Sequence, residues 1–187
     1  LHQELNGPIE KIIYYASLAG NSHNTQPWIV LVENDSMLTI KADFSRKLHI
    51  VDPDARGLFI SLGAFIENLE LAAGSFGYKA EVVINAKQKT DSIAAIIHLS
   101  KTQKSGNDLS QIENRRTLRT PFNKAEISMN HLNLLIGKDS AEVVYFSSAS
   151  EKGKYISEQT LAAYTQQAKD DQAKQELANW MRFSNSD

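Results

Sequence analysis

The strongest constraint on the fold is a long apolar segment that begins at Asp52 and carries only two charged residues, Glu67 and Glu70, after Arg56. Asp52 and Pro53 are typical of a helix N-terminus, because aspartate can accept hydrogen bonds from the first free amides and proline suits the first turn. Apolar residues then recur at helical spacing on most sides of the segment until Gly74 or Gly77. A helix with so little polar surface must be covered by other elements. We therefore expect a helix over about 53–76 to form the core of the domain.

The segments on either side of this helix carry a mixture of helix and strand patterns. Residues 8–19 have apolar side chains at helical spacing and begin with a proline, which predicts a helix. Residues 28–34 and 37–43 are rich in β-branched residues or alternate apolar with polar ones, which predicts a hairpin. The runs 79–85 and 92–100 predict two further strands. These patterns together indicate an α+β fold.

A polar stretch, residues 101–110, is the clearest boundary in the chain. Beyond it the patterns predict five elements, which are a short helix near 109–114, helices over 127–136, about 149–169 and 172–183, and a strand over 141–147. Both sides of the boundary therefore combine helices with strands. A chain of 187 residues is long enough for one domain or somewhat more.

Charge and composition exclude several classes of function. The 20 Lys and Arg residues nearly balance the 22 Asp and Glu residues. We therefore expect neither a nucleic acid nor a membrane as partner, and any anion site must be local. The absence of cysteine excludes disulfides, thiolate metal sites and thiol nucleophiles, and the unpaired spacing of the five histidines predicts no metal site. No signal peptide is evident, which favours the cytoplasm, although a chain that begins at Leu1 leaves an upstream targeting segment open.

Two polar segments could carry chemistry, and the first is a cluster of arginines. Arg115, Arg116 and Arg119 lie within five residues, in a stretch without an acid. Phosphate is the best counterion for such a cluster, since each guanidinium can donate two parallel hydrogen bonds to its oxygens. The alternatives are a solvated basic face or ion pairs with Glu113 and Glu126, and nucleic acid is a weaker candidate.

The second segment is the run Ser-His-Asn-Thr-Gln-Pro-Trp at residues 22–28, between a predicted helix and a predicted strand. Its short polar side chains can donate and accept hydrogen bonds, and loops at such junctions commonly bind ligands. The alternative is a hydrogen-bonded loop that merely turns the chain. No GxGxxG turn, P-loop or nucleophile elbow occurs in the sequence, so a nicotinamide held in a Rossmann pocket is not expected.

Taken together, the two segments resemble the nitroreductase family of FMN-dependent flavoproteins. Members carry an RRSxR-like stretch that holds the FMN phosphate and an SxxNxQPW-like stretch. The matching residues are Arg115, Arg116, Thr117 and Arg119 for the first and Ser22, Asn24, Gln26, Pro27 and Trp28 for the second. The apolar segment from Asp52 is also similar to the central helix of this family. The resemblance implies a nitroreductase-like α+β fold, with a central antiparallel or mixed sheet flanked by helices.

The order of the motifs differs from that of ordinary members, in which the arginine stretch comes first. Here it follows the loop by about 90 residues, which resembles the branch in which two degenerate repeats are fused in one chain. On this interpretation residues 1–100 are the first repeat, 101–110 a linker, and 111–187 the start of a second, incomplete repeat. The loop of one repeat would meet the arginines of the other. A second chain or a further C-terminal segment would then complete the fold.

The resemblance also implies the roles of the residues. The expected FMN-binding residues are Arg115, Arg116, Thr117, Arg119, Ser22, His23, Asn24 and Gln26. Arg115 would bind the phosphate, and Arg119 would stabilise the reduced flavin, while no residue of the protein acts as acid, base or nucleophile. The implied function is hydride transfer from NAD(P)H through FMN to a nitroaromatic or quinone-like acceptor. A flavin storage protein without turnover, or a basic-loop interaction module that binds no flavin, are the alternatives.

Overall fold

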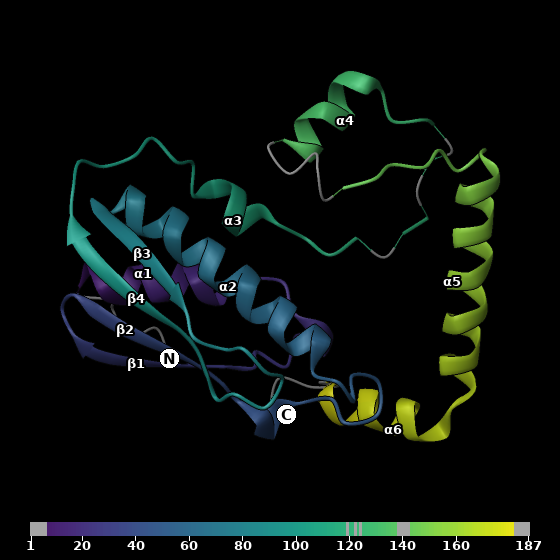
Figure 1. The fold of residues 1–187 in the computed structure, drawn as a ribbon, viewed down its shortest axis with the longest axis horizontal. Helices are drawn as coiled ribbons and strands as arrows, with labels where there is room; N and C mark the ends of the chain where they lie inside the picture. Colours follow the sequence, from purple (N-terminus) through teal and green to yellow (C-terminus); the bar gives the residue numbers. More distant parts are fainter. Residues whose placement is uncertain (1–6, 119, 122, 124, 138–142, 182–187) are drawn as a thin grey trace. The chain divides into compact units, whose positions relative to one another are not determined.

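The computed structural model describes residues 7–118, 120–121, 123, 125–137 and 143–181 (Figure 1). Contacts divide the chain into two compact units. The first consists of residues 1–117 together with 175–187, and the second of residues 118–174. Both segments that could carry chemistry begin in the first unit.

A four-stranded antiparallel sheet forms one layer of the first unit. Its strands are β1 (Trp28–Asn34), β2 (Met37–Ala42), β3 (Tyr78–Ile84) and β4 (Ile93–Lys101), in the order β1-β2-β4-β3. β1 and β2 form the predicted hairpin, and β2 also pairs with β4, with Leu38 opposite Ile97. The predicted α+β class is therefore confirmed, and the sheet is antiparallel rather than mixed.

Helices α1 (Pro8–Ser17) and α2 (Arg56–Ser75) provide the apolar layer against this sheet (Figure 1). Phe65, Leu69 and Leu62 of α2 are at most 1% exposed and share one buried cluster with apolar residues of β2 and β4. The prediction of a long central core helix is confirmed. Among the described residues α2 alone has the length and apolar composition of a membrane span, and its place in the core accounts for that composition.

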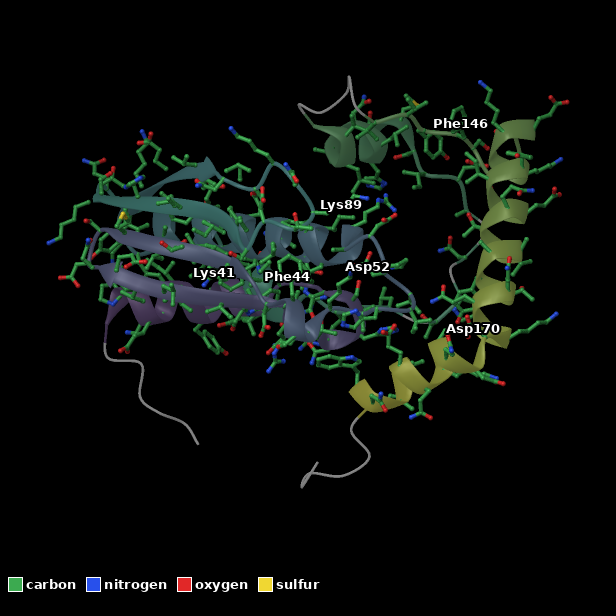
Figure 2. All side chains as sticks on the ribbon, turned by 60° about the horizontal axis from the view of Figure 1, so that its bottom comes forward. Lys41, Phe44, Asp52, Lys89, Phe146 and Asp170 are labelled. Carbon is green, nitrogen blue, oxygen red and sulfur yellow. The ribbon has the colours of Figure 1, made fainter. Side chains whose placement is uncertain are left out.

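The start of α2 differs from the prediction by three residues. Residues 52–55 form a turn, in which Ala55 has a left-handed conformation with φ of 55°, and the helix begins at Arg56. Asp52, labelled in Figure 2, still caps the helix, because its carboxylate accepts hydrogen bonds from the amides of Gly57 (3.0 Å) and Leu58 (2.9 Å). The capping residue was predicted correctly, but it acts from outside the helix.

The polar stretch 101–110 is a cap for the other end of α2. The Thr102 amide donates to the Gly77 carbonyl (2.9 Å), the Ser105 amide donates to the Gly74 carbonyl (2.8 Å), and the Asn107 side chain donates to the Leu71 carbonyl (3.1 Å). The chain then enters α3 (Ser110–Asn114), which buries Ile112. The first compact unit therefore continues through this stretch. A repeat is defined by ancestry and not by contacts, so the division into repeats stays a prediction.

The second unit contains helices α4 (Met129–Ile136) and α5 (Glu151–Lys169), each of which begins at a serine cap. Helix α6 (Asp171–Trp180) starts in this unit and ends in the first. Asp170, labelled in Figure 2, separates α5 from α6 and accepts a hydrogen bond from the Gln172 amide (2.8 Å). These helices lie where the sequence predicts helices, within a few residues at each end.

The strand predicted over 141–147 is wrong for the residues that the structure describes. Residues 143–147 are irregular, and residues 141–142 lie outside the described part of the chain. Val144 is 72% exposed. The β-branched and aromatic residues raise strand propensity, but a strand needs a neighbouring strand with which to pair, and the described part of the second unit provides none.

Candidate functional site

The loop at residues 22–26 has an unusual backbone. His23, Asn24 and Gln26 have φ values of 50°, 55° and 49°, which non-glycine residues seldom adopt. Two hydrogen bonds support this conformation. The Asn21 side chain accepts from the Gln26 amide (2.8 Å), and the Arg46 guanidinium donates to the Thr25 carbonyl (2.8 Å). Strain of this kind is concentrated at functional sites, which favours a binding loop over one that merely turns the chain.

His23 has a second unusual property. Its Nδ1 atom is buried and has no hydrogen-bond partner among the described residues. A buried polar atom without a partner costs about 1–3 kcal/mol, so such atoms are rare unless a water or ligand satisfies them. The loop therefore holds a polar atom that a bound molecule could satisfy.

Ser22 lies against the first turn of α2. A Cβ atom built on Gly57 would lie 3.1 Å from the Ser22 hydroxyl oxygen and 3.2 Å from a carboxylate oxygen of Asp52. Both distances are shorter than ordinary carbon–oxygen contacts. A side chain at position 57 would therefore require Ser22 or Asp52 to move by a few tenths of an ångström.

The C-terminal end of the loop is anchored in the core. Pro27 is fully buried and its carbonyl accepts a hydrogen bond from the Asp43 amide (3.0 Å). The Trp28 ring packs on the Phe65 ring with centroids 4.9 Å apart and an interplanar angle of 36°. Phe44, labelled in Figure 2, packs edge-on against Phe59 of α2 in the same apolar cluster. Pro27 and Trp28 thus anchor the loop in the core, although Trp28 is only half-buried.

The arginine segment reaches the chain just before this loop. Arg115 Nε donates to the Leu18 carbonyl (3.4 Å) at the end of α1, and its Nη1 donates to the Thr117 hydroxyl (3.3 Å). A Cβ atom on Gly20 would lie 3.5 Å from Arg115 Nη1. Residues about 95 positions apart in the sequence are thus neighbours within one unit.

Tyr15 and Glu113 hold the arginine segment in this place. The Tyr15 hydroxyl of α1 donates to a carboxylate oxygen of Glu113 (2.8 Å), and Asn68 of α2 donates to the Tyr15 carbonyl (3.3 Å). The hydrogen bond to Glu113, together with burial, raises the pKa of Tyr15 above its ordinary value. α3, which leads directly to Arg115, is therefore attached to α1 by a charge-assisted contact.

Neither Arg115 nor Arg116 pairs with a carboxylate among the described residues. Arg116 Nη1 donates to the carbonyls of Glu113 (2.7 Å) and Arg115 (2.8 Å). The Glu113 carboxylate is engaged by Tyr15, and Glu126, within the second unit, accepts from Tyr145 and Ser147, which lowers the pKa of Glu126. Within the first unit, the alternative in which Glu113 neutralises Arg115 or Arg116 is therefore not observed. The guanidiniums retain donors for an external anion.

The predicted site residues are thus partly brought together. Arg115, Arg116 and Thr117 share the first unit with Ser22, His23, Asn24 and Gln26, and Arg119 lies outside the described residues. No hydrogen bond between described residues joins the two segments directly. Tyr15, Asn68, Arg46 and Gly57 support the site and were not predicted, because their roles depend on contacts distant in the sequence.

The donor set suits a flavin mononucleotide. FMN has a dianionic phosphate, for which the guanidiniums of Arg115 and Arg116 are suitable donors, and a polar ring edge, for which His23 and Asn24 have suitable groups. A metal centre lacks comparable support, since the described residues contain no group of three His, Cys, Asp or Glu side chains able to hold an ion.

Comparisons with known proteins give weak similarities. No protein-family model matches the chain. No curated protein sequence matches it either. A nitroreductase-like protein from Streptococcus mutans aligns with a TM-score of 0.40 at 15% identity, over 59% of this chain and 86% of that chain. A nitroreductase family protein from Streptococcus pneumoniae aligns with a TM-score of 0.39 at 15% identity, over 61% of this chain and 84% of that chain. Similarity at this level identifies no function, so the functional inference depends on the residues of the site.

Proposed function

We propose that the chain is an FMN-binding oxidoreductase of nitroreductase type. The observation that carries the proposal is the placement of Arg115, which forms no ion pair with a described carboxylate, beside the turn that leads into a strained loop with an unsatisfied histidine nitrogen. The two segments that resemble the family motifs are also the two segments with these unusual features. A basic surface without a ligand would not require the strained loop.

Each segment has a distinct task in this proposal. Arg115 and Arg116 bind the phosphate, and the Thr117 hydroxyl contributes a further donor beside it. Ser22, His23, Asn24 and Gln26 contact the flavin from the loop. Bound FMN would supply the redox chemistry, which is hydride transfer from NAD(P)H to a nitroaromatic or quinone-like acceptor.

Arg119 would complete the site electrostatically. Its positive charge would lie beside the pyrimidine edge of the flavin and would favour the reduced anionic form. The reductant and the acceptor are small molecules that bind in turn, which requires no Rossmann pocket. The same proposal includes a cytoplasmic location and no nucleic acid or membrane partner. It also includes completion of the fold by a second chain or by further C-terminal sequence.

The proposal is tested first by FMN uptake. The full chain is purified, mixed with FMN, passed through a desalting column and examined by its visible spectrum. We expect the protein fraction to carry the visible spectrum of oxidised flavin in stoichiometric amount. A colourless protein that leaves all FMN in the small-molecule fraction would refute flavin binding.

A second measurement separates an enzyme from a flavin store. The loaded protein is mixed anaerobically with excess NADPH or NADH in a stopped-flow instrument, and the flavin absorbance is followed. Bleaching, followed by recovery when a quinone is added, is the expected result. A flavin that remains oxidised under excess reductant would contradict the oxidoreductase and support storage.

A further inference from the structure

The loop at residues 47–55 receives a contact from the far end of the chain. Glu176, in the second half of α6, accepts hydrogen bonds from the amides of Ile50 and Val51, each 3.0 Å long and each to a different carboxylate oxygen. By their contacts residues 175–181 belong to the first unit, so this interaction lies within that unit. Two successive amides that converge on one carboxylate form a small anion-binding nest.

The middle of this loop has few other interactions that could fix its conformation. His49 is exposed and Ile50 is 40% exposed, whereas Leu48 and Ala55, near the two ends of the loop, are buried. Hydrogen bonds brace the rest of the loop. Lys47 Nζ donates to the Pro53 carbonyl (2.7 Å) and the Asp52 amide donates to the Leu48 carbonyl (3.1 Å). The two charge-assisted hydrogen bonds that Glu176 accepts are therefore a large part of what holds the middle of the loop.

The same loop supports the candidate flavin site. Val51, whose amide binds Glu176, directly precedes Asp52. The Asp52 carboxylate holds the amides at the start of α2, and Gly57 there is in close contact with Ser22. A continuous chain of short contacts thus runs from Glu176 through the loop and the first turn of α2 to the strained segment.

We propose that Glu176 is a positioning residue for the candidate flavin site, and that docking of the second half of α6 regulates the affinity of that site for FMN. The carboxylate fixes the amides of Ile50 and Val51, which orients Asp52 and through it the turn on which Ser22 lies. The affinity effect rests on the proposed function, whereas the coupling between the loop and α2 does not require a ligand.

The test compares Glu176→Gln with wild type by amide hydrogen exchange in the ligand-free chain. A glutamine has the same shape, but only one of its two terminal atoms accepts hydrogen bonds. We expect exchange at Ile50 and Val51 to accelerate about tenfold, as for loss of a charge-assisted hydrogen bond. Exchange at Gly57 and Leu58 is expected to accelerate about threefold, while the amides of β4 are unchanged.

The affinity arm measures the FMN dissociation constant. Glu176→Gln should raise it about threefold to tenfold, whereas Glu158→Gln, the same change at an exposed position of α5, should leave it unchanged. If Glu176→Gln does not fold, Glu176→Asp replaces it, since the charge is retained but the carboxylate is one methylene farther away. The same readouts then apply.

The outcomes separate the two proposals. The positioning role would be overturned if exchange becomes faster at Ile50 and Val51 while exchange at Gly57 and Leu58 and the FMN affinity do not change. Glu176 would then only attach its own helix to the loop. Equal effects of Glu158→Gln would overturn it as well. Failure of the wild-type chain to bind FMN would instead refute the proposed function.

Discussion

Replacement of Arg115 by alanine tests the site at its most specific contact. In the structure the guanidinium is exposed, and its two internal hydrogen bonds are long, 3.4 Å to the Leu18 carbonyl and 3.3 Å to the Thr117 hydroxyl. Hydrogen bonds of this length and exposure contribute about 0.5 kcal/mol or less each to folding. We therefore expect the free energy of unfolding of Arg115→Ala to stay within about 1 kcal/mol of the wild-type value.

The effect of Arg115→Ala on FMN affinity should be much larger than its effect on the free energy of unfolding. A guanidinium that donates to a phosphate forms charge-assisted hydrogen bonds worth about 1.5–3 kcal/mol. Its removal should weaken FMN binding about 10- to 150-fold. Arg115→Lys keeps the charge but loses the planar pair of donors, so its affinity should lie between those of the wild type and Arg115→Ala.

Quenching of FMN fluorescence on titration with protein gives the dissociation constants. The ionic strength must be the same for all variants, because exposed charges are screened by salt. Lys11→Ala is the matched control, since it removes one exposed positive charge from α1. Equal affinity of Arg115→Ala and wild type would remove Arg115 from the phosphate site. Equal losses in Arg115→Ala and Lys11→Ala would reduce the effect to net charge.

Three further predictions address the loop, its anchor and the support of the arginine segment. Gly63→Ala, in an open position of α2, should stabilise the protein by about 0.5–1 kcal/mol, whereas Gly57→Ala should stabilise it less and lower FMN affinity by displacing Ser22 or Asp52. Identical melting shifts and unchanged affinity would contradict the close approach at Gly57. Trp28→Ala should lower the free energy of unfolding, measured in urea, by about 2–3 kcal/mol, which is below the range for a fully buried tryptophan. Trp28→Phe should lower it by about 1 kcal/mol. No loss in either variant would show that the ring does not anchor the loop. Because the pKa of Tyr15 is raised in the folded state, its hydrogen bond to Glu113 stabilises the fold below pH 10 and is lost as the pH rises through the folded-state pKa. The stability advantage of wild type over Tyr15→Phe should therefore shrink above pH 10, and a constant advantage would mean that another interaction is responsible.

Local patterns in the sequence were sufficient for most elements of the first unit. The hairpin of β1 and β2 was predictable because alternation and β-branching are local signals that meet at a short polar turn. The core helix was predictable because a helix that is apolar on most sides must be covered by other elements. Its start was predicted three residues early, since the left-handed turn at Ala55 lets Asp52 cap amides five and six residues away.

Other features depend on partners that are distant in the sequence. The pairing of β2 with β4 crosses more than fifty residues, and no local pattern specifies it. The apolar run at 143–147 has strand propensity but no partner strand in the described part of its unit, so propensity alone led to a wrong prediction. Residues of the site were identified by their types, whereas the strain at His23 and the contact of Gly57 with Ser22 required the fold.

The position of the arginine segment follows from the way in which α2 ends. The last carbonyls of a helix need donors, and here the stretch after β4 supplies them at Leu71 and Gly74 and also donates to Gly77, just beyond the helix. A chain bound along that end cannot act as a free tether. It enters α3 at a fixed point, buries Ile112, and is held to α1 by Tyr15. Arg115 consequently reaches the end of α1, a few residues before the loop at residues 22–26, by contacts within the first unit alone. Residues far apart in sequence therefore meet because each end of the core helix must be capped, by Asp52 beside the loop and by the polar stretch that leads to the arginines.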